Sequence, residues 1–124
     1  MVALADTDIL IAAIRGNEMA KGVLRKYNRS LIISAITVAE LYVGATSNEK
    51  KKIVEQILAD HELIELNKAI TETAIRLIKE YNTPTRKLLL ADAFIAATCI
   101  EHKAGLLTFN TKDFHFIKGV KLVK

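Results

Sequence analysis

Three acidic residues of this chain stand after or within apolar segments. Asp6 follows the apolar segment Val2–Ala5, and Glu40 comes shortly after the apolar residues Leu31–Ile33. Asp92 is the one charge in the most apolar run of the chain, Leu88–Ile100. An unpaired carboxylate in such surroundings is costly, so Asp92 needs a cation, a set of donors or a solvent-filled cleft. The alternative is a place in the first turn of a helix, where the helix dipole favours an acid.

Acids that meet in one cleft repel each other, and a divalent cation offsets that repulsion. Oxygen ligands alone favour Mg²⁺ or Mn²⁺ over zinc or copper. Such an ion stabilises charge on a phosphodiester and turns a bound water into a nucleophile. The net charge of +4 fits a polyanionic partner. These features together predict metal-assisted hydrolysis of a nucleic-acid backbone.

Each acid also has an explanation that requires no site. If a helix begins at Ile9, we expect Asp8 to be its N-cap, a role that would not be open to Asp6. Glu40 stands three residues after Thr37, as in a capping box in which the acid bonds back to the helix start. Asn110 and Asp113 have the same three-residue spacing, which favours an N-cap and its partner.

The segments that would carry these residues alternate between strand and helix. Buried strands are predicted at 2–5, 31–33, 63–66, 105–109 and 120–123. Helices are predicted from Ile9, over 18–27, around Thr37–Gly44, over 48–60, after an Asn67 N-cap, and through the Asp92 run. This alternation indicates an α/β fold, a three-layer α/β/α sandwich with a mainly parallel central sheet, in a single domain over 1–124. In open α/β sheets, ligands bind at the carboxyl ends of the strands, which is where Asp6, Glu40 and Asn110 are expected.

Composition narrows the class of protein. The chain has 124 residues, 51% of them hydrophobic and 26% charged, as in an ordinary globular domain. No uncharged apolar run is long enough to span a membrane, and the N-terminus lacks the features of a signal peptide. The one cysteine, Cys99, is expected to be a buried residue in a reducing cytoplasm. The loop cations Arg86 and Lys87 lie either near the entrance of the site or on an ordinary charged loop.

Four segments resemble, in order and spacing, the motifs of PIN-domain ribonucleases, and most closely those of VapC-type toxins of toxin–antitoxin pairs. Four such motifs in order are more specific than any one of them. The resemblance covers almost the whole chain. The segments are Asp6–Ile11, Ser34–Gly44, Leu90–Thr98 and Leu107–Phe114.

The resemblance implies a Mg²⁺- or Mn²⁺-dependent endoribonuclease in which Asp6 and Asp92 bind the ion directly. Glu40 would bind it directly or through water, and the Thr7 hydroxyl would be a neighbouring polar contact. Asn110 occupies the position of an aspartate in many relatives, so either Asn110 or Asp113 would complete the site. The family further implies an RNA substrate, a homodimer, and a cognate antitoxin that wraps the toxin and blocks the site.

Other classes of protein are compatible with part of this pattern. A PIN fold without catalysis would be an RNA- or protein-binding module, although the three acids argue against it. A phospho-acceptor receiver module has this length and alternation, but the strand predicted at 63–66 lacks the aspartate that such a module needs. A haloacid-dehalogenase-type phosphatase would use Asp6 and Asp8 as a D-x-D pair, but the chain is short for the further motifs of that class.

Overall fold

The computed structural model describes residues 1–124 and contains one sheet of five strands. All neighbouring strands are parallel, in the order β3-β2-β1-β4-β5. The first strand therefore lies at the centre, between β2 and β4. The strands are β1 Ala3–Ala5, β2 Leu31–Ser34, β3 Glu62–Ile64, β4 Gly105–Leu107 and β5 Lys121–Leu122.

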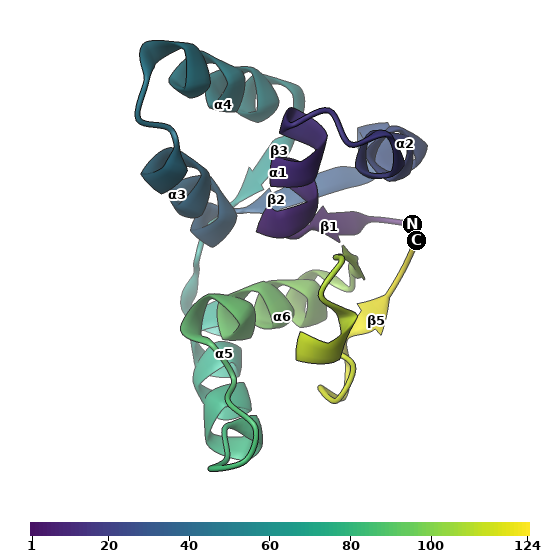
Figure 1. The fold of residues 1–124 in the computed structure, drawn as a ribbon. Helices are drawn as coiled ribbons and strands as arrows, with labels where there is room; N and C mark the ends of the chain where they lie inside the picture. The colour runs from purple at the N-terminus through teal and green to yellow at the C-terminus, as the bar shows by residue number, and fades with distance from the viewer.

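Six α-helices cover the two faces of this sheet. In Figure 1, helices α1 to α4 lie on one side of the strands, and α5 and α6 lie on the other. The predicted three-layer arrangement is therefore confirmed. The helices are α1 Thr7–Ile14, α2 Glu18–Tyr27, α3 Ala35–Gly44, α4 Asn48–Asp60, α5 Lys68–Tyr81 and α6 Leu90–His102, with 3₁₀ turns η1 Asn28–Ser30 and η2 Thr111–Asp113.

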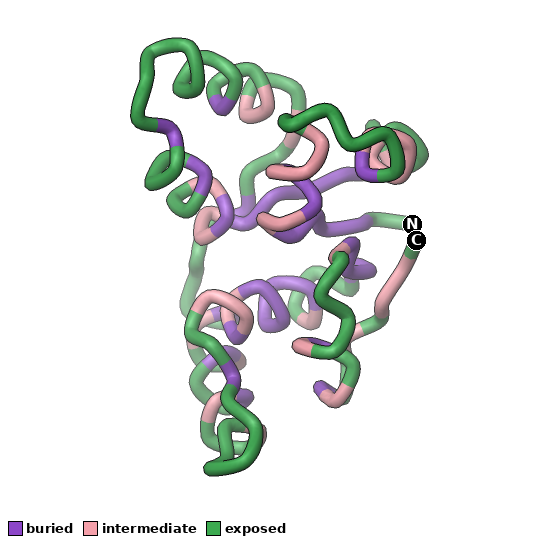
Figure 2. Tube along the Cα trace, in the orientation of Figure 1, coloured by how far each residue is buried: buried purple, intermediate pink, exposed green.

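Alternate strand residues enter two separate hydrophobic cores, as the two-residue period of a strand requires. Leu4 and Ile32 pack with α5 and α6, whereas Ala3, Ala5 and Ile33 pack with α1 to α4. Because both faces are covered, the three inner strands β1, β2 and β4 are buried along their whole length and almost entirely apolar, whereas the edge strands β3 and β5 each carry an exposed charged residue. Figure 2 shows this burial along the strands and along much of α6.

Helix α6 is the most deeply buried helix, as its composition predicts. Six of its residues are buried, and Cys99 among them is 1% exposed. Burial raises the pKa of the Cys99 thiol to about 12, so this side chain is a core residue and not a reactive thiol. The helix ends at Lys103, which adopts a left-handed conformation.

Several predicted boundaries shift by one to three residues. Strands β4 and β5 end earlier than predicted, and β3 begins one residue earlier and ends at Ile64. The Asn67 N-cap is confirmed, because its side chain accepts the Ile70 N–H at 2.9 Å. None of the helices combines the length and apolar composition needed to cross a membrane.

Candidate functional site

Asp6 lies at the carboxyl end of the central strand and caps helix α1. Its backbone is extended (φ −69°, ψ 159°), and its carboxylate accepts the Thr7 N–H at 2.8 Å. The prediction that Asp8 is this N-cap is wrong, because the helix begins at Thr7 and not at Ile9. The second carboxylate oxygen of Asp6 accepts the Thr108 hydroxyl at 2.8 Å. Asp6 is 5% exposed, so its orientation is closely defined by these partners.

Asp8 and Thr108 form a connection that the sequence analysis missed. Asp8 lies in the first turn of α1, and its carboxylate accepts the Phe109 N–H at 3.0 Å. The Thr108 hydroxyl lies 3.4 Å from each Asp8 carboxylate oxygen and accepts the Asn110 N–H at 3.0 Å. These bonds hold the segment after β4 against the start of α1. The only sequence signal for this role is the position of Thr108 directly after a buried strand.

Glu40 points toward α1 and not back to its own helix start. The N-cap of α3 is Ser34, whose hydroxyl accepts the Ile36 N–H at 3.2 Å, so the predicted Thr37–Glu40 capping box is wrong. The Thr7 hydroxyl instead donates to Glu40 at 2.6 Å. The buried Thr37 hydroxyl lies 3.1 Å from the same Thr7 oxygen. Thr7 is thus a polar contact of Glu40, one of the candidate ligands.

Asp92 lies in the first turn of α6, where the helix dipole favours an acid. The first-turn explanation of this residue therefore holds, and Asp92 is in addition influenced by other carboxylates. Burial, then the charges of Asp113, Glu40 and Asp8, raise the pKa of Asp92 to about 6. The negative charges of three other carboxylates thus disfavour the ionised form of Asp92 at the start of α6.

Asp6 shows a larger shift of the same sign. Its pKa rises to about 7, mainly because of burial and then because of the Asp8 charge, with a smaller effect from Asp92. Hydrogen bonds from Thr108 and Thr7 lower it in part. None of the three ion pairs of the protein includes any of these acids. The acids therefore form a negatively charged cluster that no lysine or arginine neutralises.

Within the segment 110–113, Asp113 is the residue whose charge acts on this cluster. Asp113 belongs to η2, and its charge is the largest electrostatic influence on Asp92. Asn110 is exposed, and its side chain makes no cap hydrogen bond, so the predicted cap pair is wrong. The structure thus brings together the five acids Asp6, Asp8, Glu40, Asp92 and Asp113, which come from α1 and its N-cap, α3, α6 and η2.

The donor chemistry of this cluster fits a hard divalent cation. All available ligands are carboxylate oxygens, the type that Mg²⁺ and Mn²⁺ prefer, and repulsion among them is relieved by a cation. As the side chains lie, no three of the acidic, histidine or cysteine residues gather closely enough to hold an ion. Asp6 is hydrogen-bonded to Thr7 and Thr108, and Glu40 is hydrogen-bonded to Thr7.

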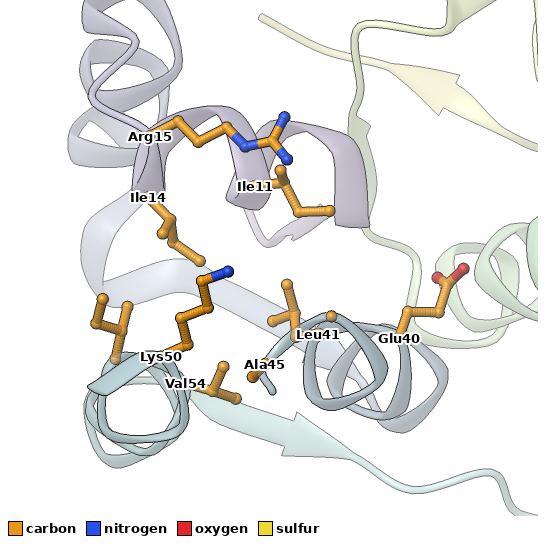
Figure 3. Close-up of a pocket in the computed structure, with 10 residues that line it drawn as sticks. Ile11, Ile14, Arg15, Glu40, Leu41, Ala45, Lys50 and Val54 are labelled. Carbon is orange, nitrogen blue, oxygen red and sulfur yellow. The ribbon is translucent and has the colours of Figure 1, made fainter. Parts of the chain in front are cut away.

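A largely apolar groove opens beside the acids, between α1, α3 and α4 (Figure 3). It encloses about 190 Å³, with Arg15 and Lys50 among its lining residues. In Figure 3 the Glu40 carboxylate points away from the groove. Glu40 therefore borders both the groove and the other acids of the cluster. The apolar lining consists of Ile11, Ile14, Leu41, Ala45, Ile53 and Val54.

The PIN domain family model matches residues 3–119, a range that includes every acid of the cluster. The chain belongs to the PIN domain family. The resemblance drawn from four sequence motifs is therefore confirmed, together with the α/β fold that it implied.

Individual PIN relatives are similar over almost their whole length. Ribonuclease VapC1 of Rickettsia felis is 31% identical over 97% of this chain and 93% of its own. Ribonuclease VapC10 of Mycobacterium tuberculosis is 29% identical over 95% of this chain and 90% of its own.

Solved PIN structures agree with the fold at the same coverage. A toxin–antitoxin complex from Klebsiella pneumoniae has a TM-score of 0.83 and 38% identity, over 95% of this chain and 94% of the other. VapBC2 from Rickettsia felis, solved with a DNA fragment from its promoter, has a TM-score of 0.88 and 25% identity, over 99% of this chain and 98% of the other. Similarity in sequence and in fold therefore extends over almost the whole chain.

Proposed function

We propose that this PIN domain is a divalent-metal-dependent endoribonuclease and the toxin of a toxin–antitoxin pair. The observation that carries the proposal is the cluster of acids at one sheet edge, in which Asp6 and Asp92 have raised pKa values and no basic side chain compensates them. The names of the relatives support the reaction class, because they are ribonucleases of the VapC type. The net charge of +4 supports a polyanionic substrate.

We assign the ion to Asp6, Asp92, Glu40 and Asp113, with Asp113 rather than Asn110 as the fourth ligand. Bound Mg²⁺ or Mn²⁺ would stabilise charge on the phosphodiester and lower the pKa of a water nucleophile. Thr108 holds Asp6, and Thr7 holds Glu40, so these two hydroxyls orient candidate ligands from outside the site. Such supporting bonds tune both the basicity and the position of a ligand.

The groove supports a protein partner on the same side of the molecule. Its apolar lining and its volume of about 190 Å³ suit side chains of an inserted polypeptide segment. Because Glu40 borders both groove and acid cluster, a segment in the groove would lie beside the candidate catalytic residues. We propose that the cognate antitoxin binds here and blocks the site, in line with the toxin–antitoxin complexes among the structural neighbours. We also propose a homodimer, in which a second copy would cover the exposed Leu89 and Leu90.

Expression in bacterial cells tests the toxin proposal. Induction of the wild-type protein should stop growth and fragment cellular RNA, whereas Asp92→Asn, which keeps the shape of the side chain, should do neither. Equal growth arrest by both proteins would remove the acid cluster from the toxic effect. Western blots of equal intensity would exclude a difference in expression level.

A further inference from the structure

Arg86 is held on an aromatic platform in the loop between α5 and α6. Its guanidinium carbon lies 4.0 Å from the centre of the Phe116 ring and 5.9 Å from that of Tyr81. The two rings are tilted against each other at 5.8 Å. At 4.0 Å the cation is in contact with the ring of Phe116, so its position is restricted before any ligand arrives.

The backbone around Arg86 is fixed as well. Thr83 and Arg86 form an antiparallel bridge with hydrogen bonds in both directions, and the Thr83 hydroxyl also accepts the Arg86 N–H at 3.0 Å. The Asn82 side chain accepts the Leu88 N–H at 2.9 Å. On the other side, the Tyr81 hydroxyl accepts the Lys118 N–H at 3.0 Å, which ties the platform to the segment after η2. The loop is therefore a braced turn rather than a loose connection.

This braced arginine has no anionic partner in the protein. Arg86 is exposed and takes part in none of the three ion pairs. A guanidinium that stacks by its face keeps its N–H donors at the edge, where they match the oxygens of a phosphate. The unused donors of Arg86 are therefore free to bind an anionic partner from outside the chain.

Arg86 and its platform residue Phe116 lie on the two segments that carry Asp92 and Asp113 of the candidate site. It precedes Asp92 by six residues, and its platform residue Phe116 follows Asp113 by three. The acid cluster repels an RNA backbone, so a bound strand needs cations on the flanks of the cluster. Arg86 and its platform lie on these two chain segments, and Lys87, Lys112 and Lys118 are exposed along the same two segments.

We propose that Arg86, stacked on Phe116 and Tyr81, binds a backbone phosphate of the bound RNA strand. This inference rests on the proposed ribonuclease function and adds to it a fixed phosphate contact outside the metal ligands. The aromatic platform matters because it lowers the entropy that a flexible arginine loses on binding. Lysine at this position would keep the charge but lose both the stacking and the two-pronged contact.

Fluorescence anisotropy tests this contact with a labelled single-stranded RNA of mixed sequence and a 2′-O-methyl backbone, which resists cleavage. Arg86→Gln should weaken binding about tenfold, as expected for one lost charge-assisted contact. It should also reduce the slope of log K against log [salt] by about 0.7. Arg86→Lys and Phe116→Leu should each give an intermediate loss, because they remove the stacking but keep the charge.

The matched control is Arg29→Gln, which removes an exposed arginine just before β2, at the opposite edge of the sheet. It should change the affinity less than twofold. Equal effects of Arg86→Gln and Arg29→Gln would overturn the proposed contact while leaving the ribonuclease proposal intact. A wild-type protein that neither binds nor cleaves RNA would overturn both. Melting curves that match the wild type would show that the variants are folded. If Arg86→Gln is not folded, Phe116→Leu still tests the contact.

Discussion

The Thr7 hydroxyl donates a 2.6 Å hydrogen bond to the Glu40 carboxylate and joins the start of α1 to α3 across 33 residues of chain. The buried Thr37 hydroxyl lies 3.1 Å from the same Thr7 oxygen, so Thr7 is itself held in place. Glu40 in turn raises the pKa of Asp92. The Thr7 hydroxyl thus orients Glu40, whose charge in turn raises the pKa of Asp92.

Removal of this hydroxyl should impair cleavage more than folding. Thr7→Val keeps the shape of the side chain but leaves Glu40 without its donor. We expect RNA cleavage to fall about tenfold, the effect of one lost hydrogen bond to a charged group at a partly exposed position. Cleavage rates at fixed metal concentration measure this. Thr46→Val, at an exposed threonine in the α3–α4 connection, is the control, and equal rates in the two variants would contradict the role of Thr7.

Metal binding by two variants tests whether Asp113 or Asn110 is the fourth ligand of the ion. The Asp113 charge acts on Asp92, whereas the Asn110 side chain is exposed and makes no cap hydrogen bond. Asp113→Asn should therefore weaken Mn²⁺ binding about tenfold or more, as is typical for groups that support a metal site. Asn110→Ala should change the affinity less than threefold. Calorimetric titration with Mn²⁺ measures both values, and a larger loss in Asn110→Ala would assign the fourth ligand to Asn110.

Stability should depend on pH in a direction that the acid cluster determines. Asp6 and Asp92 have pKa values of about 7 and about 6 in the folded protein, raised from an ordinary value of 3.8. The folded state therefore binds protons more tightly than the unfolded chain between about pH 4 and 7, and the free energy of unfolding falls as the pH rises through this range. With chelator present, we expect the melting temperature to be several degrees higher at pH 5 than at pH 8.

Two comparisons isolate the cluster from the other titrating groups. Asp92→Asn should raise the melting temperature at pH 8 and flatten the profile, because it removes one repelled charge. Added Mg²⁺ should stabilise the wild type more at pH 8 than at pH 5, since protons compete with the ion for the same oxygens. Parallel profiles for wild type and Asp92→Asn would show that Asp92 carries no raised pKa in the folded protein.

Two glycines should respond in opposite ways to alanine. A Cβ at Gly105 would lie 2.6 Å from Val123 Cγ1, and the Val123 backbone is bonded to Leu106, so we expect Gly105→Ala to lower the free energy of unfolding by about 1–3 kcal/mol. A Cβ at Gly22, inside α2, would meet nothing within 4 Å. Gly22→Ala should therefore raise the free energy of unfolding by about 0.5–1 kcal/mol. Urea denaturation measures both, and a stabilised Gly105→Ala would show that β5 moves away freely.

The layers and the meeting of Asp6, Glu40 and Asp92 could be predicted from sequence because they depend on coarse signals, whereas the place of Asp8 in the cluster was not predicted. Alternating apolar strands and helices specify a parallel sheet with two covered faces, and an acid in the apolar run of α6 marks Asp92. The carboxyl ends of parallel strands share one edge, which brings Asp6 and Glu40 to the same region. These inferences survive an error of a few residues in any boundary.

The roles within the cluster could not be predicted, because they depend on single residues. A helix start two residues earlier makes Asp6 the N-cap and frees Asp8 to bind the Phe109 N–H. A cap at Ser34 instead of Thr37 turns Glu40 toward Thr7. Thr108 acts across 102 residues on Asp6, and no local pattern reports a contact at that separation.

Cleavage of purified cellular RNA by the purified protein tests the central claim most directly. The reactions compare wild type, Asp6→Asn and Asp60→Asn, each with Mn²⁺ and with excess chelator; Asp60 is an exposed acid at the end of α4. We predict that wild type and Asp60→Asn cleave only with Mn²⁺, and that Asp6→Asn is slower by about a hundredfold or more. Cleavage by Asp6→Asn at the wild-type rate, or cleavage that persists in chelator, would contradict a metal-dependent site built on this acid cluster.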